Sequence, residues 1–90
     1  MSEGTVNPRL RATILRVVDE QMRNNDPPET GHTFARLVQE GHSKEEAKRL
    51  IACVVASEIF EVMNRREPFD RQRFINALNQ LPKMPWEANA

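Results

Sequence analysis

Several residue types are scarce in this chain of 90 residues, and each shortage excludes a class of protein. A single cysteine excludes an internal disulfide and a metal centre built from several thiolates. Three glycines are too few for a glycine-rich phosphate loop or a dinucleotide-binding fingerprint. The longest apolar run, "IACVVA", spans residues 51–56, whereas a transmembrane helix needs about 20 apolar residues. These shortages leave a small protein that folds around one modest apolar core.

Neither sign of charge is in excess, because 13 basic residues balance 13 acidic ones and the formal net charge is zero. No global electrostatic field therefore attracts nucleic acid or a membrane. The first ten residues, "MSEGTVNPRL", contain no basic stretch followed by an apolar one, so we expect no signal peptide. Cys53 lies inside the longest apolar run, which favours a reduced thiol in the core and a cytoplasmic protein.

Helical periodicity, by contrast, is abundant. Apolar residues recur at three- and four-residue spacing along almost the whole chain, tyrosine is absent, and nothing indicates strands. The sequence therefore predicts an all-α protein, a single compact four-helix domain over residues 1–90 with helices at about 8–24, 29–40, 44–64 and 71–81. Residues 1–6 and 87–90 are expected to be flexible ends.

Local signals predict where the helices begin and end. Asn7 is a candidate N-cap for the first helix and Asp70 for the fourth, while Gly41 is a candidate stop for the second. The stretch "SKEE" matches a capping box, in which Ser43 and Glu46 satisfy each other's backbone N–H groups at the start of the third helix.

The third helix has the broadest apolar stripe, from Ala47 to Met63, which predicts that it is the central element. Phe69 is expected to pack on Phe74, and Trp86 to fold back onto the bundle with Met84. The residues predicted to be buried are Leu10, Ile14, Val17, Leu37, Leu50, Ile51, Val54, Val55, Phe74 and Leu78.

The stretch "NNDPPETGHTF", residues 24–34, joins the first two predicted helices and is either a turn or a site. Its prolines, glycine and acidic residues are typical of a turn, and Thr30 is a candidate cap. His32 and His42 are ten residues apart, whereas a chelating pair on a helix needs a spacing of three or four. We interpret the stretch as a turn, and we predict no metal, no cofactor and no catalytic residue.

Two polar residues interrupt the apolar stripes, Glu58 on the third helix and Gln21 on the first. A carboxyl group on an apolar face must find a partner, become neutral or reach water. The two side chains could hydrogen-bond each other, or an arginine could pair with Glu58. The functional alternative is a perturbed acid in a cleft, the starting point of an enzyme or a ligand-binding site.

The stretch "NRREPFDRQRF" places several arginines at one corner, with two phenylalanines among them. Arginines beside aromatic rings can grip phosphates and stack on bases, which suggests a nucleic-acid contact. Glu67 and Asp70 dilute the positive charge, so a solvated corner is the alternative. The candidate contacts, which we call the arginine corner, are Arg65, Arg66, Arg71 and Arg73.

The third helix also carries apolar residues on more sides than three short neighbours cover. Ala52, Ala56 and Phe60, together with Cys53, are expected at an uncovered edge of this helix. Large exposed apolar patches mark partner sites, and a two-fold homodimer is the simplest closed assembly. This edge is therefore the candidate interface with a protein partner or a second copy.

Three segments together resemble a family of small uncharacterised bacterial proteins that is classed as a domain of unknown function. They are "NDPPET", "EGHSKEEAKRLIA" with "SEIFEVM" behind it, and "FDRQRFINALNQLP", and the resemblance covers about residues 8–86. It implies a bacterial, cytoplasmic, compact helical protein, and it assigns no site residue.

The sequence therefore predicts a non-catalytic helical interaction module that binds a protein partner or itself. A nucleic-acid-binding accessory protein that uses the arginine corner is the second hypothesis. An enzyme or a ligand-binding role centred on Glu58 is the third. We expect no membrane association.

Overall fold

The computed structural model describes residues 8–87, and these residues form four α-helices and no strand. The helices are α1 (Pro8–Asn24), α2 (Pro28–Gln39), α3 (Lys44–Arg65) and α4 (Arg71–Gln80). The prediction of an all-α, four-helix fold is confirmed. The expected Asn7 cap lies outside the described residues, and so do the expected flexible ends except residue 87.

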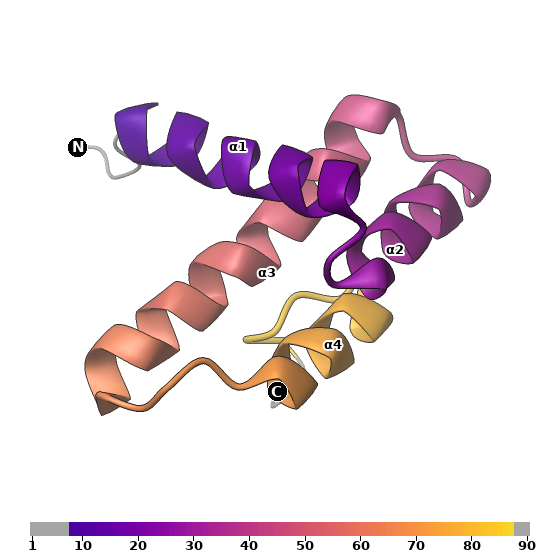
Figure 1. Ribbon diagram of the computed structural model, residues 1–90. Helices are drawn as coiled ribbons and strands as arrows, with labels where there is room; N and C mark the ends of the chain where they lie inside the picture. The colour runs from indigo at the N-terminus through magenta and orange to yellow at the C-terminus, as the bar shows by residue number, and fades with distance from the viewer. Residues whose placement is uncertain (1–7, 88–90) are drawn as a thin grey trace.

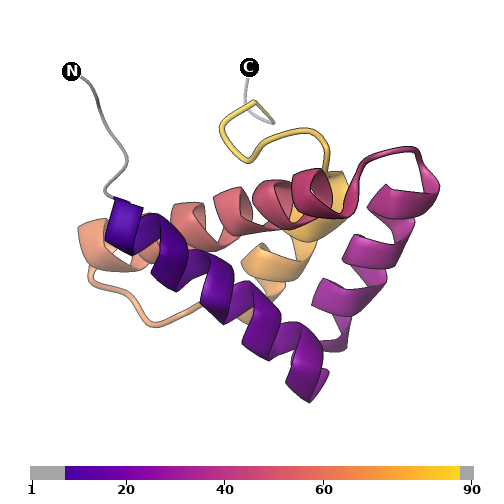
Figure 2. The same cartoon turned by 90° about the horizontal axis from the view of Figure 1, so that it is seen from above.

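Helix α3 is the central element, because it packs against each of the other three helices and contributes more residues to the buried core than any of them. Figure 1 shows that α1 crosses α3, and that the start of α1 and the end of α3 then diverge. Figure 2 shows the same crossing from above, with α2 and α4 on the side away from those two ends. Within the described part of the chain, α1 and α4 do not contact each other. No described helix combines the length and apolar character needed to cross a membrane.

The stretch at residues 24–34 contains the turn between α1 and α2 at residues 25–27, and its remaining residues belong to the two helices. Asn25 adopts a left-handed conformation with φ 52°, and the Asp26 N–H donates to the Gln21 carbonyl at 3.0 Å, an arrangement that commonly ends helices. Pro28 begins α2, where its missing N–H costs nothing. Thr30 is not a cap, because it is fully buried inside α2 and its hydroxyl donates to the Gln21 side chain.

Helix α2 ends at a glycine in the predicted place. Gly41 has a φ of 110°, a value that side-chain-bearing residues rarely adopt, and the His42 N–H donates to the Leu37 carbonyl at 3.1 Å. The chain can therefore turn within the four residues between α2 and α3, and α3 begins at Lys44.

Side-chain caps begin α3 and α4. The Ser43 hydroxyl accepts from the Glu46 N–H, and the Asp70 carboxylate accepts from the Arg73 N–H, each at 3.0 Å. Only half of the predicted capping box forms, because the Glu46 carboxylate accepts from Arg49 at 3.0 and 2.6 Å instead of returning to Ser43. A forked guanidinium satisfies both carboxylate oxygens at once, which a single backbone N–H cannot do.

The apolar core lies where α3 meets the other helices. Eight of the ten residues predicted to be buried are buried, namely Ile14, Leu37, Leu50, Ile51, Val54, Val55, Phe74 and Leu78. Val17 is only partly buried against this core, and Leu10 is 52% exposed, so the prediction for Leu10 was wrong. Leu10 lies in the first turns of α1, where α1 has already diverged from α3 (Figure 1). The apolar stripe of a helix does not reveal how far along it the neighbouring helix extends.

The segment after α4 only partly follows the prediction. Met84 packs against the core, and the ring centroids of Phe69 and Phe74 lie 5.6 Å apart. Trp86, however, is 62% exposed, contrary to the expectation that it folds into the bundle. It lines an open hollow beside Phe60, because buried side chains of α2, α3 and α4 already fill the core.

The core assignment predicts a stability difference between two identical substitutions. Leu50→Ala should lower the free energy of unfolding by about 2–4 kcal/mol, because it removes buried contacts and leaves a cavity. Leu10→Ala makes the same chemical change at a half-exposed site and should cost about 1 kcal/mol or less. Urea denaturation measures both, and equal losses would contradict the assigned core.

Candidate functional site

Glu58 of α3 is the one charged residue in the described part of the chain that is buried, with 6% of its surface exposed. Its carboxylate lies at the N-terminus of α4. Arg73 donates to it twice, from Nε to Oε1 at 2.9 Å and from Nη2 to Oε2 at 2.7 Å. The Asp70 backbone N–H donates to Oε2 at 3.1 Å. Both carboxylate oxygens are therefore satisfied by a bidentate, charge-assisted pair and one further donor.

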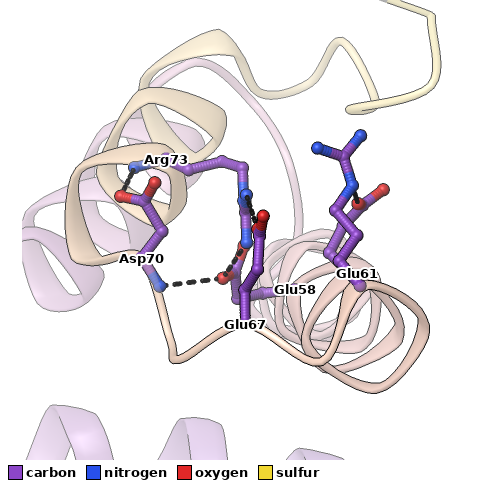
Figure 3. A network of polar contacts seen from close by, with 6 residues as sticks. Glu58, Glu61, Glu67, Asp70 and Arg73 are labelled. Carbon is purple, nitrogen blue, oxygen red and sulfur yellow. Dashed lines mark hydrogen bonds and ion pairs between the residues drawn. The ribbon is translucent and has the colours of Figure 1, made fainter.

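These groups cap α4 from outside the helix, as Figure 3 shows. Asp70 is the N-cap of α4, and Arg73 is the third residue of that helix. In an ordinary capping box, a glutamate at the third position returns to the N-cap N–H. Here Arg73 occupies that position, and Glu58 from α3 supplies the carboxylate to the Asp70 N–H. The start of α4 is thereby tied to α3.

The surroundings of Glu58 favour its ionised form. The hydrogen bonds from Arg73 lower the pKa of Glu58 below its ordinary value of 4.5, burial opposes this shift, and the Asp70 N–H adds to it. A general acid or base working near neutral pH needs a pKa close to that pH. A carboxylate with both oxygens occupied and a lowered pKa is suited to holding α4 in place. The hypothesis of an enzyme or ligand site centred on Glu58 gains no support from this geometry.

The predicted hydrogen bond between Glu58 and Gln21 is not formed. Gln21 Oε1 instead accepts from the Thr30 hydroxyl at 3.0 Å, which ties α1 to α2. The arginine alternative is the one that the structure shows, with Arg73 as the partner of Glu58. The physical reason is that a guanidinium offers two aligned donors and a positive charge, whereas an amide offers neither the charge nor the fork.

The arginine corner is largely occupied by intramolecular ion pairs. Arg65, Arg71 and Arg73 have carboxylate oxygens at 2.7, 3.7 and 2.7 Å, on Glu61, Asp26 and Glu58 respectively. Arg66 ends α3 in a left-handed conformation with φ 54° and makes no ion pair with another described residue. Three of the four guanidinium groups thus pair with three different carboxylates, and nucleic-acid binding stays a prediction.

The histidines and the cysteine are not brought together. His32 is exposed, His42 is half-buried, and Cys53 is a free, half-buried thiol on α3. Within residues 8–87, no group of three or more His, Cys, Asp and Glu side chains is placed to hold a metal ion.

An apolar groove of about 330 Å³ lies between α1 and the C-terminal half of α3. Buried residues of the core, Val55 and Phe74, form its floor. Ile59, Met63 and Phe69 also line it and are exposed, and Met63 is the most exposed of the three at 72%. We call this feature the α1–α3 groove.

A second hollow, of about 580 Å³, lies on a different side of α3 and is lined by Phe60 and Trp86, with Ala56 and Cys53. It overlaps the edge predicted as an interface. Phe60 is 65% exposed, as that prediction requires, whereas Ala52 and Ala56 are half-buried and pack against the core. The edge therefore presents Phe60 to solvent, and the two alanines contribute little exposed surface.

Comparison with protein families gives one match. A family model described as a domain of unknown function (DUF1841) matches residues 1–80, a range that includes all four helices. The chain belongs to this family. The match agrees with the resemblance noted from the sequence, and the family description assigns no activity. Comparisons with curated proteins and with solved structures gave no match.

In this DUF1841 domain, the feature that sequence reasoning missed is the α1–α3 groove. Ile59 and Met63 belong to the apolar stripe of α3, so they were expected to face the core. The signal that could have found the groove is helix length, because α3 has 22 residues whereas α4 has ten and α1 only crosses it. Short neighbours cannot cover the whole stripe of a long helix.

The capping role of Glu58 predicts a pH-dependent stability. Glu58→Gln should lower the free energy of unfolding by about 1–3 kcal/mol at neutral pH, because Arg73 loses its charged partner. Since the pKa of Glu58 is lowered in the folded state, its contribution is complete above about pH 4.5 and disappears as the pH falls through the folded value. Glu61→Gln, on the same helix, is the control and should cost about 0.5 kcal/mol or less. A Glu58→Gln deficit that persisted unchanged at pH 2 would refute the charged role.

The arginine corner can be tested without disturbing the cap of α4. We expect no binding of single-stranded RNA or DNA at low salt, because three of the four guanidinium groups already have carboxylate partners. If binding is detected, replacing Arg65, Arg66 and Arg71 by Gln should weaken it and reduce its salt dependence. Arg73 is left unchanged because it anchors Glu58. Binding with the predicted loss of salt dependence would establish the nucleic-acid hypothesis.

Proposed function

We propose that this chain is a non-catalytic helical interaction module that binds another protein through the apolar surface at the C-terminal half of α3. The proposal includes the bacterial, cytoplasmic setting that the sequence resemblance implies. The free thiol of Cys53 supports a reducing compartment.

The observation that carries this proposal is a cluster of exposed apolar side chains. Six large apolar residues are exposed in the described part of the chain, and three of them, Ile59, Phe60 and Met63, lie within five consecutive residues of α3. Phe69 follows in the connection to α4 and is exposed as well. Single exposed apolar residues are normal, but contiguous patches mark sites where a partner binds.

The residue types in the cluster suit a protein partner. Methionine adapts its flexible side chain to irregular surfaces, and phenylalanine supplies a large apolar area with few rotatable bonds. Because Phe60 and Met63 are each more than half exposed, burying them against a partner removes most of their surface from water. Full burial of such a side chain contributes on the order of 1.5–3 kcal/mol.

The polar groups of the chain support the same choice. The Glu58 carboxylate and three guanidinium groups of the arginine corner are already engaged within the molecule. The apolar side chains of the α3 cluster, in contrast, face solvent. The surface at the C-terminal half of α3 that is left available for a partner is therefore apolar.

Site-specific photo-crosslinking in native cells tests the proposal. A photoreactive residue at Asn64, which is exposed on α3 beside the cluster, should form adducts with a partner protein, whereas the same residue at the exposed Asn79 of α4 should not. The double change Phe60→Glu and Met63→Glu should abolish the Asn64 adducts, because it introduces two charges into the apolar surface.

A matched control keeps this test independent of folding. The double change Gln39→Glu and Asn79→Glu adds the same charge at exposed positions of α2 and α4 and should leave the Asn64 adducts intact. Both double variants should retain their thermal unfolding, because all four side chains are exposed. Adducts that survive in the Phe60 and Met63 variant, or that form equally at Asn79, would contradict the proposed surface.

A further inference from the structure

The α1–α3 groove is open to solvent, although Phe74 of α4 and Phe69 of the connection to α4 also line it. The N-terminal end of α1 diverges from α3, and within the described part of the chain the backbones of α1 and α4 do not pack against each other (Figure 1). Core residues, among them Val55 and Phe74, are left as the floor of the groove. Glu58 also lines it, but Arg73 and the Asp70 N–H already satisfy both of its oxygens. An apolar occupant therefore leaves no carboxylate without a partner.

We infer that the occupant of this groove is a second copy of the same chain, related to the first by a two-fold axis. This inference rests on the proposed interaction function and specifies the partner. A two-fold interface requires one surface to carry both a protrusion and a hollow, since each protomer presents the same patch. Met63 protrudes at the rim of the groove, and the groove itself is the hollow. In this pairing Met63 of each protomer enters the groove of its partner.

The charges of the chain suit self-association. The formal net charge is zero, so no long-range repulsion opposes the approach of two copies. Arg16 and Glu20 lie one helical turn apart beside Val17, outside the groove itself, and Glu20 also pairs with Arg23 of the same helix at 2.8 Å. When two α1 helices run antiparallel across a two-fold axis, Arg16 of one protomer faces Glu20 of the other. This arrangement places opposite charges at the rim of an apolar contact.

The available area predicts a weak dimer. Helix α1 has 17 residues, which corresponds to a length of about 25 Å, and two adjacent helices present a width of roughly 20 Å. The resulting face is on the order of 500 Å², below the ~800 Å² per partner of a standard stable interface. Association is therefore expected at micromolar to millimolar concentrations.

Analytical ultracentrifugation of the purified full chain tests the inference, at concentrations from about 10 µM to about 1 mM. We expect the weight-average mass to rise from 10.4 kDa toward that of a dimer. Met63→Glu should raise the dissociation constant at least about tenfold, because it introduces a charge into the apolar contact. Met63→Gln, a milder change, should weaken association in the same direction. Trp86→Glu alters an exposed aromatic residue in the other hollow and should leave association unchanged.

The combination of the two experiments distinguishes failure of the dimer from failure of the proposed function. A monomer at every concentration overturns the dimer, while crosslinking of a different protein at Asn64 still supports the interaction module. A dimer that is lost in Trp86→Glu but kept in Met63→Glu overturns the groove as its interface. Absence of any adduct at Asn64 together with a monomeric chain overturns both.

Discussion

The ion pair between Glu58 and Arg73 determines where α4 lies on α3, and the exposed surfaces follow from that position. Removing a carboxylate from water is costly, and the cost is offset only when its oxygens are well satisfied. Here two guanidinium N–H groups of Arg73 and the Asp70 N–H donate hydrogen bonds to the Glu58 carboxylate at 2.7–3.1 Å. Such pairs are often no more stabilising than apolar residues of similar size, although breaking one is costly. Their contribution here lies in position, because all three bonds join the start of α4 to one side chain of α3.

This position leaves the end of α3 without a complete set of neighbours. Helix α4 starts beside Glu58 and turns back along α3, while α1 crosses α3 and diverges (Figure 1). The last two turns of α3 therefore extend past both helices. They carry Ile59, Phe60 and Met63, which are apolar but exposed to solvent instead of packed in the core. The same anchor that orders α4 thus produces the surface that we propose for binding.

Partner binding has a further thermodynamic consequence for a domain of this size. A chain of 90 residues buries a limited core, and its net stability is a small difference between large terms. Any partner that binds the folded state alone adds to that stability by mass action. An apolar surface at the end of α3 therefore couples the stability of the module to the concentration of its partner, whether that partner is another protein or a second copy.

The amino-acid sequence by itself determined the helices, their ends and most of the core. Asp70 and Ser43 as caps, Gly41 as a stop, and the apolar spacing of α3 depend on contacts within about four residues, so the local sequence contains the necessary information. Only the tertiary structure decided the partner of Glu58 and the exposure of Leu10, Met63 and Trp86. These depend on where α1 and α4 lie relative to α3. A periodic stripe shows that a face is apolar, but the lengths and crossing of distant helices decide whether anything covers it.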